Sequence, residues 1–178
     1  CLERPAPNEP LDVPKPISFA WPGNAFGPEA RKVLLEAGYR FGRRGMQPEI
    51  AYGEIVPGPV YDPRAHDALL IPSAGDAYPE WTLEHFKKVA AQAVEGRAVV
   101  LQFHGVPDVA HPWVHTEPER FETFMRYLKD EGFNVIAMRD LARYVDGDGA
   151  DEKVWTRYPE VPEDRLVYSQ EEQSIRDE

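Results

Sequence analysis

Between residues 17 and 145 the sequence alternates short apolar runs with amphipathic stretches, and this alternation restricts the fold more than any other feature. The apolar runs predict strands over residues 17–21, 39–43, 68–72, 98–103 and 133–138. Strands and helices that alternate through short connections form right-handed crossovers, and such crossovers build a parallel sheet. We therefore expect an α/β fold with parallel strands.

The stretches between these runs carry apolar residues at helical spacing. They predict helices over residues 28–37, 83–95, 117–131 and 139–145. Pro28 suits the first turn of the first helix, and Gly38 suits its C-terminal cap. Thr82 is a typical N-cap for the second helix. At the third, Thr116 with Glu119 three residues later matches a capping box.

The number of strands limits the architecture. Five strands are too few for a closed parallel barrel, which usually has about eight, so either the sheet is open or strands are missing from this chain. Residues 1–16, which hold five prolines, are expected to form an extended lead-in to a domain over residues 17–146. Residues 147–178 are expected to form an acidic tail, because residues 146–178 carry 11 acidic and 4 basic side chains.

Composition excludes several classes of protein. The chain has 31 acidic and 20 basic side chains and a net charge of −11, whereas a nucleic-acid-binding module needs a basic face. It contains no run of about 20 apolar residues, so we expect no membrane span. Cys1 is the single cysteine, which leaves no internal disulfide and no thiolate metal cluster.

His104 is the candidate catalytic residue. It directly follows residues 98–103, the most strand-like run in the chain, which is expected to be buried on both faces. Parallel α/β proteins bind their ligands at the carboxyl ends of strands. An imidazole at such an end can exchange protons near neutral pH.

Tryptophans lie in or beside three of the loops expected at the same edge of the sheet. Their indole faces are suited to stacking on sugar rings, although core packing is the alternative for any single tryptophan. With their polar neighbours they give the predicted substrate-binding set of Trp21, Pro22, Trp81, Asp108, His111 and Trp113.

The loop after His104 allows a second interpretation. His111 and His115 are four residues apart, the spacing of a metal-binding pair on a helix. Asp108 would supply a third ligand. Pro112 lies between the two histidines and favours a loop, so a rigid loop that shapes a pocket is the preferred interpretation.

Short motifs also follow one another in order along the chain. They are Ser18-Phe19-Ala20-Trp21-Pro22-Gly23, Gly38-Tyr39, Leu101-Gln102-Phe103-His104-Gly105, Gly132-Phe133-Asn134-Val135 and Asp140-Leu141. Over about residues 16–145 this set resembles the C-terminal half of a polysaccharide deacetylase (NodB-homology) domain. The resemblance implies a barrel-like fold of parallel strands whose N-terminal strands are missing from this chain. It also implies a hydrolase that removes acetyl groups from N-acetylated sugars, with His104 as general acid toward the leaving amine.

The same resemblance implies a divalent metal, most typically zinc, held by one aspartate and two histidines. The motifs that supply these ligands are absent upstream of Ile17. We therefore expect the ligands outside this chain, in a missing N-terminal half that is its partner. Ala20 stands where many members have an arginine, and Arg43-Arg44-Gly45 stands where the family has the aspartate that partners the late histidine. Asp108 or Asp76 would take that place.

Two other functions fit the same residues. A hydrolase of C–N bonds in small amides would bind an anionic substrate through Arg43 and Arg44 and through the loop of His111 and His115. A surface salt bridge with Glu49 is an equally good interpretation of the two arginines. A non-catalytic carbohydrate-binding protein would use the tryptophans without a metal. A polysaccharide substrate favours an extracellular or cell-envelope location for the protein.

Overall fold

The computed structural model of the protein describes residues 15–51 and 53–145. Most of the expected lead-in and all of the expected acidic tail lie outside the described residues. The strands and α-helices, in chain order, are β1 (Ser18–Ala20), α1 (Pro28–Glu36), β2 (Phe41–Arg44), β3 (Ile71–Pro72), β4 (Gly75–Asp76), α2 (Leu83–Ala90), β5 (Leu101–Gln102) and α3 (Pro118–Asp130). Short 3-10 helices cover Pro22–Asn24, Ala68–Leu70, Pro112–Val114 and Met138–Arg143. None of the helices in these residues is both long and apolar enough to cross a membrane.

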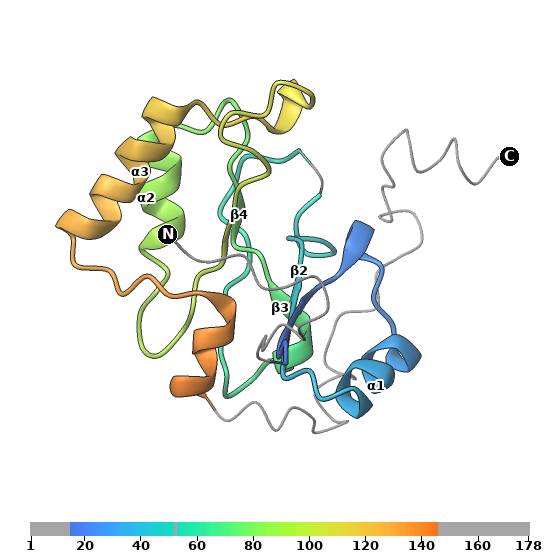
Figure 1. The fold of residues 1–178 in the computed structure, drawn as a ribbon. Coiled ribbons are helices and arrows are strands. Elements are labelled where there is room, and N and C mark those ends of the chain that lie inside the picture. Colours follow the sequence, from blue (N-terminus) through green and yellow to red (C-terminus); the bar gives the residue numbers. More distant parts are fainter. Residues whose placement is uncertain (1–14, 52, 146–178) are drawn as a thin grey trace, which may run out of the picture.

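The strands form two short parallel ladders. β1 pairs with β2 and β2 pairs with β3, while β4 pairs with β5 (Figure 1). Backbone hydrogen bonds continue between the ladders, because Ser73 N–H donates to the Arg44 carbonyl and Ala74 N–H donates to the Val100 carbonyl. Paired strands therefore follow the order of the chain. The prediction of an α/β fold with parallel strands is confirmed at the level of this class.

The largest hydrophobic cluster joins α2 and α3 to the β4–β5 pair, and the two helices lie side by side (Figure 1). Phe86 of α2 and Phe124 of α3 are fully buried, and their rings stack with centroids 4.3 Å apart. Trp81 packs into the same cluster over Gly75, where a Cβ atom would come within 2.1 Å of the indole ring. These aromatic contacts fix the strand that leads into His104.

Residues 68–70 correct the prediction of a strand over 68–72. They form a 3-10 helix, and the strand is confined to β3. The Asp67 side chain accepts a hydrogen bond of 2.8 Å from the Leu69 N–H and forms a buried ion pair with Arg31. A capping carboxylate thus overrides the strand preference of an apolar run.

The predicted capping box at the third helix is also wrong. The N-cap of α3 is Glu117, which makes no side-chain capping bond. Thr116 is buried, and its hydroxyl donates to the Ala77 carbonyl at 3.0 Å. A tertiary contact therefore takes the hydroxyl that the local pattern assigned to the helix.

Two predicted strands are shortened or absent. Within residues 98–103 only β5 is a strand, and these residues are half-buried instead of buried on both faces. Residues 133–137 form no strand, and the side chains of Val135 and Ile136 are 66 and 37 % exposed. Strand geometry is stabilised by a hydrogen-bonded neighbour, and none of the described strands pairs with this segment.

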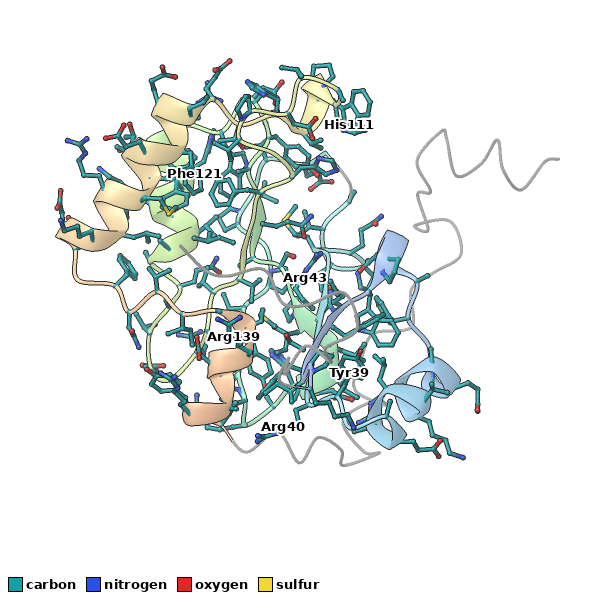
Figure 2. All side chains as sticks on the ribbon, in the orientation of Figure 1. Tyr39, Arg40, Arg43, His111, Phe121 and Arg139 are labelled. Carbon is teal, nitrogen blue, oxygen red and sulfur yellow. The ribbon has the colours of Figure 1, made fainter. Side chains whose placement is uncertain are left out.

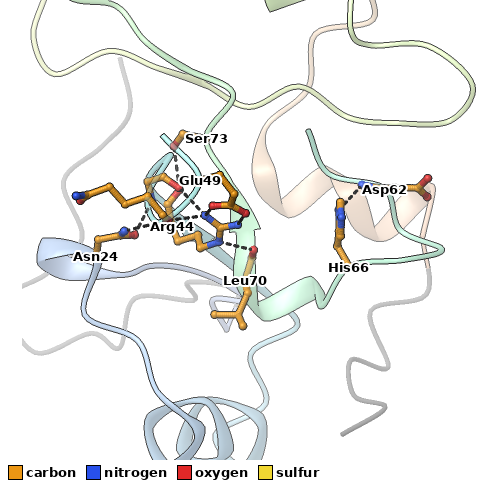
Figure 3. Close-up of polar contacts among 9 residues, drawn as sticks. Asn24, Arg44, Glu49, Asp62, His66, Leu70 and Ser73 are labelled. Carbon is orange, nitrogen blue, oxygen red and sulfur yellow. Dashed lines mark hydrogen bonds and ion pairs between the residues drawn. The ribbon is translucent and has the colours of Figure 1, made fainter. Parts of the chain in front are cut away.

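His66 holds the long connection after β2 by a hydrogen bond that depends on its protonation state. Figure 3 shows this contact with Asp62. The His66 Nδ1 accepts a hydrogen bond of 2.9 Å from the Asp62 N–H, which protonation at Nδ1 would break. Burial lowers the pKa of His66 below its ordinary value. The carboxylates of Asp62 and Glu49 oppose this lowering, and the Arg44 guanidinium adds to it. The folded chain therefore takes up this proton less readily than the unfolded chain.

We expect the free energy of unfolding to fall as the pH drops below about 6.5, the ordinary pKa of histidine, because the unfolded chain is protonated first. The decline should be smaller in His66→Gln. Urea unfolding at about pH 7.5 and about pH 5 measures the difference. His85→Gln changes a half-buried histidine outside this connection, and its stability should decline like that of the wild type. An equal decline in His66→Gln and the wild type would contradict the role of His66.

Candidate functional site

His104 lies just beyond the carboxyl end of β5. Its side chain is 49 % exposed, and its Nδ1 forms a short contact with the Asp108 carboxylate. The strand beneath it is held by hydrogen bonding, since the Ala77 N–H donates to the Gln102 carbonyl at 3.0 Å. The structure thus joins the predicted catalytic histidine to one of the two carboxylates considered as its partner.

Asp108 is the centre of this site. Its Oδ1 accepts a hydrogen bond of 2.9 Å from the His111 N–H and lies 3.0 Å from His111 Nδ1. The hydrogen bond from His104 has the largest effect on the carboxyl group, and with those from His111 it lowers the pKa of Asp108 to about 2. An ionised carboxylate only accepts hydrogen bonds, so both Nδ1 atoms carry protons and each neutral ring keeps its lone pair on Nε2.

The loop that carries the site is anchored at His115. The His115 Nδ1 accepts a hydrogen bond of 2.9 Å from the Asp108 N–H, and its Nε2 lies 2.8 Å from the Glu117 carboxylate. The Thr116 N–H donates to the Gly105 carbonyl, which closes the loop onto the end of β5. Both nitrogens of His115 are therefore engaged, and this histidine orients Asp108 without joining the His104–His111 contact.

Gly105 permits the approach of Asp108. A Cβ atom at this position would lie 2.6 Å from the Asp108 Cβ and 3.0 Å from its Oδ2. Gly105→Ala is therefore expected to displace the carboxylate and to lower the free energy of unfolding by about 1–3 kcal/mol. The displacement is measured as loss of the hydrogen-bonded Nδ1 proton of His104 in the NMR spectrum.

Gly27→Ala is the matched control for this substitution. A Cβ atom at Gly27 would meet no atom within 4 Å, so the His104 resonance should be unchanged. A Gly105→Ala protein that keeps the wild-type resonance would show that Asp108 does not depend on this close contact.

The three tryptophans do not form one exposed surface. Trp113 is 53 % exposed and meets His111 edge-on, with ring centroids 5.5 Å apart. The place of His111 in the fold is marked in Figure 2. Trp21 and Trp81 are buried, and the Trp21 Nε1 donates to the Leu69 carbonyl at 2.7 Å. Trp21 and Trp81 therefore pack in the core and do not offer an indole face to a sugar ring. Trp113 alone of the three keeps an exposed face that a sugar ring can stack on.

The remaining predicted residues lie along the carboxyl ends of β1 and β2. Pro22 is exposed and begins the 3-10 helix after β1. Arg44 is buried and bonds the Glu49 carboxylate at 2.6 and 2.8 Å, so of its two expected roles the structure shows the salt bridge with Glu49 (Figure 3). Arg43 donates to the Gln102 Oε1 at 2.7 Å.

Gln102 has a role that the sequence reasoning did not assign to it. Its Oε1 accepts hydrogen bonds from Arg43 and from the Ser73 hydroxyl, at 2.7 and 2.9 Å. These contacts connect β5 with the end of β2 and the turn after β3, two residues before His104. A polar residue inside the apolar run over 98–103 was the signal that would have identified it.

One group in the described part of the chain has the composition of a metal site. His104, Asp108 and His111 each offer one ligand atom, and these atoms lie within 4.8 Å of one another. They differ in chain order from the ligands that the family resemblance implies, and they include the histidine expected to act as the acid. The described residues therefore do not reproduce the metal centre of that family.

Comparisons with protein-family models, with curated proteins and with solved structures find no significant match to this chain.

Proposed function

We propose that this chain forms the C-terminal part of a metal-dependent hydrolase that removes acetyl groups from N-acetylated sugars. The observation that carries the proposal is the half-exposed His104 at the carboxyl end of β5, held through Nδ1 by the ionised Asp108. This is the arrangement of a general acid whose ring is oriented by a carboxylate and whose Nε2 faces the reaction.

Hydrolysis of an acetamide adds water to the carbonyl and breaks the C–N bond. The departing nitrogen is a poor leaving group unless it takes a proton as the bond breaks. His104 in its protonated form supplies this proton from Nε2, while the Asp108 carboxylate stabilises the imidazolium before transfer. His111 lies beside the His104 ring and Trp113 lies beside His111, and both offer exposed surface for the sugar.

The metal-binding residues and the attack of water are assigned to an N-terminal part of the domain. Two features support this assignment. Among the described strands, β1 pairs only with β2 and β5 only with β4, so each of these two strands has one edge without a described strand partner. In residues 133–137, Val135 and Ile136 are exposed, and no described strand pairs with this segment. Additional strands would cover both edges, as in a parallel barrel in which paired strands follow the chain.

The two alternative functions receive less support from the same residues. An anionic small amide would need a free cation, but Arg44 bonds Glu49 and Arg43 bonds Gln102. A protein that only binds carbohydrate would rely on several exposed tryptophans, and Trp113 alone is exposed among the three considered. A polysaccharide substrate places the proposed activity outside the cell or in its envelope.

The test is hydrolysis by the protein that combines this chain with its N-terminal part, measured as acetate release from N-acetylated sugars and as ring opening of cyclic amides. N-acetylated chito-oligosaccharides should be hydrolysed, whereas small cyclic amides should not. The 178-residue chain alone should be inactive. Cleavage of cyclic amides without cleavage of the oligosaccharides would favour the small-amide alternative over the proposal. Activity on neither substrate would contradict the proposal that the protein is a hydrolase.

A further inference from the structure

We infer that His104, Asp108 and His111 bind a first-row divalent cation, with Zn²⁺ as the ion that the donor set fits best. Two imidazoles and one carboxylate are ligands that zinc takes commonly. The inference concerns ligands within this chain, and it does not rest on the proposed deacetylase activity.

The spacing of the donor atoms carries this inference. One donor atom from each residue lies within 4.8 Å of the other two. His111 Nδ1 lies 3.0 and 3.2 Å from the two Asp108 carboxylate oxygens. In a tetrahedral zinc site with bonds of about 2.0–2.1 Å, neighbouring ligand atoms lie about 3.3 Å apart. Small rotations of the two rings would therefore bring all three donors to a common ion.

Exposure and anchoring favour an ion at this place. The side chains of His104 and His111 are 49 and 48 % exposed, which gives an ion access and leaves coordination positions for water. Asp108 is only 12 % exposed and is held from behind, since its N–H bonds His115. Supporting contacts of this kind orient metal ligands and raise affinity. The net charge of −11 also favours the approach of a cation.

The two uses of His104 exclude each other. A ring that ligates an ion through Nδ1 loses the Nδ1 proton that now faces Asp108, and it no longer acts as the oriented imidazolium. A bound zinc ion would therefore turn the proposed acid into a ligand, so the site would respond to free zinc.

The test is calorimetric titration of the 178-residue chain with Zn²⁺, with Co²⁺ absorption as a second readout. All samples carry Cys1→Ser, so that the single thiol contributes no ligand. One Zn²⁺ per chain is expected, and His111→Gln and Asp108→Asn should each lower the affinity by at least about tenfold. His85→Gln changes a half-buried histidine outside the group and should bind like the parent.

Absence of saturable binding in the folded parent would overturn the inference. Equal affinity of His111→Gln and the parent would also overturn it. His111 is exposed and lies outside the hydrophobic clusters, so this variant remains informative even where Asp108→Asn fails to fold. Because no substrate is present, the outcome is independent of whether the chain belongs to a deacetylase.

Discussion

Replacement of His104 by glutamine is expected to lower the rate of acetate release by about 10²- to 10⁴-fold, the usual contribution of a general acid. Glutamine is polar and of similar reach, but it has no proton to give to the leaving nitrogen. The loss should fall on kcat with little change in KM, because the proton is needed only as the C–N bond breaks. Steady-state kinetics on N-acetylated chito-oligosaccharides, with the N-terminal part present, measure both constants.

Asp108→Asn separates the positioning role from proton donation. Asparagine keeps the size of the side chain but loses the charge that holds the His104 Nδ1 proton, so kcat should fall while KM stays near its wild-type value. His85→Gln is the matched control for His104→Gln and should keep the wild-type kcat. Glutamine at this N3 position of α2 preserves the capping box with Thr82. Wild-type kcat in His104→Gln would contradict His104 as the proton donor.

Phe86→Ala is expected to lower the free energy of unfolding by about 3–5 kcal/mol. Phe86 is fully buried, stacks on Phe124 at 4.3 Å and meets Trp81 edge-on at 6.5 Å. The cavity left by the ring lies between α2 and α3, where the backbone cannot close without separating the helices. Urea unfolding of the full chain measures the loss as a shift in the midpoint.

Val33→Ala provides the comparison for Phe86→Ala. Val33 is also apolar and helical, but it is 62 % exposed on α1, so its replacement should change the free energy of unfolding by at most about 0.5 kcal/mol. If Phe86→Ala cost no more than Val33→Ala, the Phe86–Phe124 stack would not be the centre of the core.

The helices were predictable from sequence because the signals that delimit them are local. Pro28 begins α1, and Gly38 follows its cap with a φ of +85°. The Thr82 hydroxyl accepts a hydrogen bond from the His85 N–H at the start of α2, as an N-cap should. The end of α2 was placed too late, since the helix stops at Ala90 and not at residue 95.

The strands were less predictable because their formation depends on distant partners. Residues 133–138 have strand-like composition, yet no described strand pairs with them. The apolar run over 68–72 begins as a 3-10 helix because the side chain of the preceding Asp67 caps it. Asp67 also pairs with Arg31, 36 residues away. A pattern read along one segment contains neither of these contacts.

The site was predictable only where its contacts are local in the sequence. Asp108 follows His104 by four residues, so their contact within one short loop was within reach of sequence reasoning. The burial of Trp21 was not, because it depends on a hydrogen bond to Leu69, 48 residues further along the chain. The role of Gln102 likewise depends on Arg43, which comes from a different strand.

Native mass spectrometry of the protein isolated from its source tests most directly whether this chain works as part of a larger hydrolase. The proposal predicts a species heavier than the 20.2 kDa of this chain, in which an additional N-terminal polypeptide and a divalent metal accompany it. A species of 20.2 kDa alone, in a sample that releases acetate from N-acetylated oligosaccharides, would contradict completion of the site by residues outside the chain.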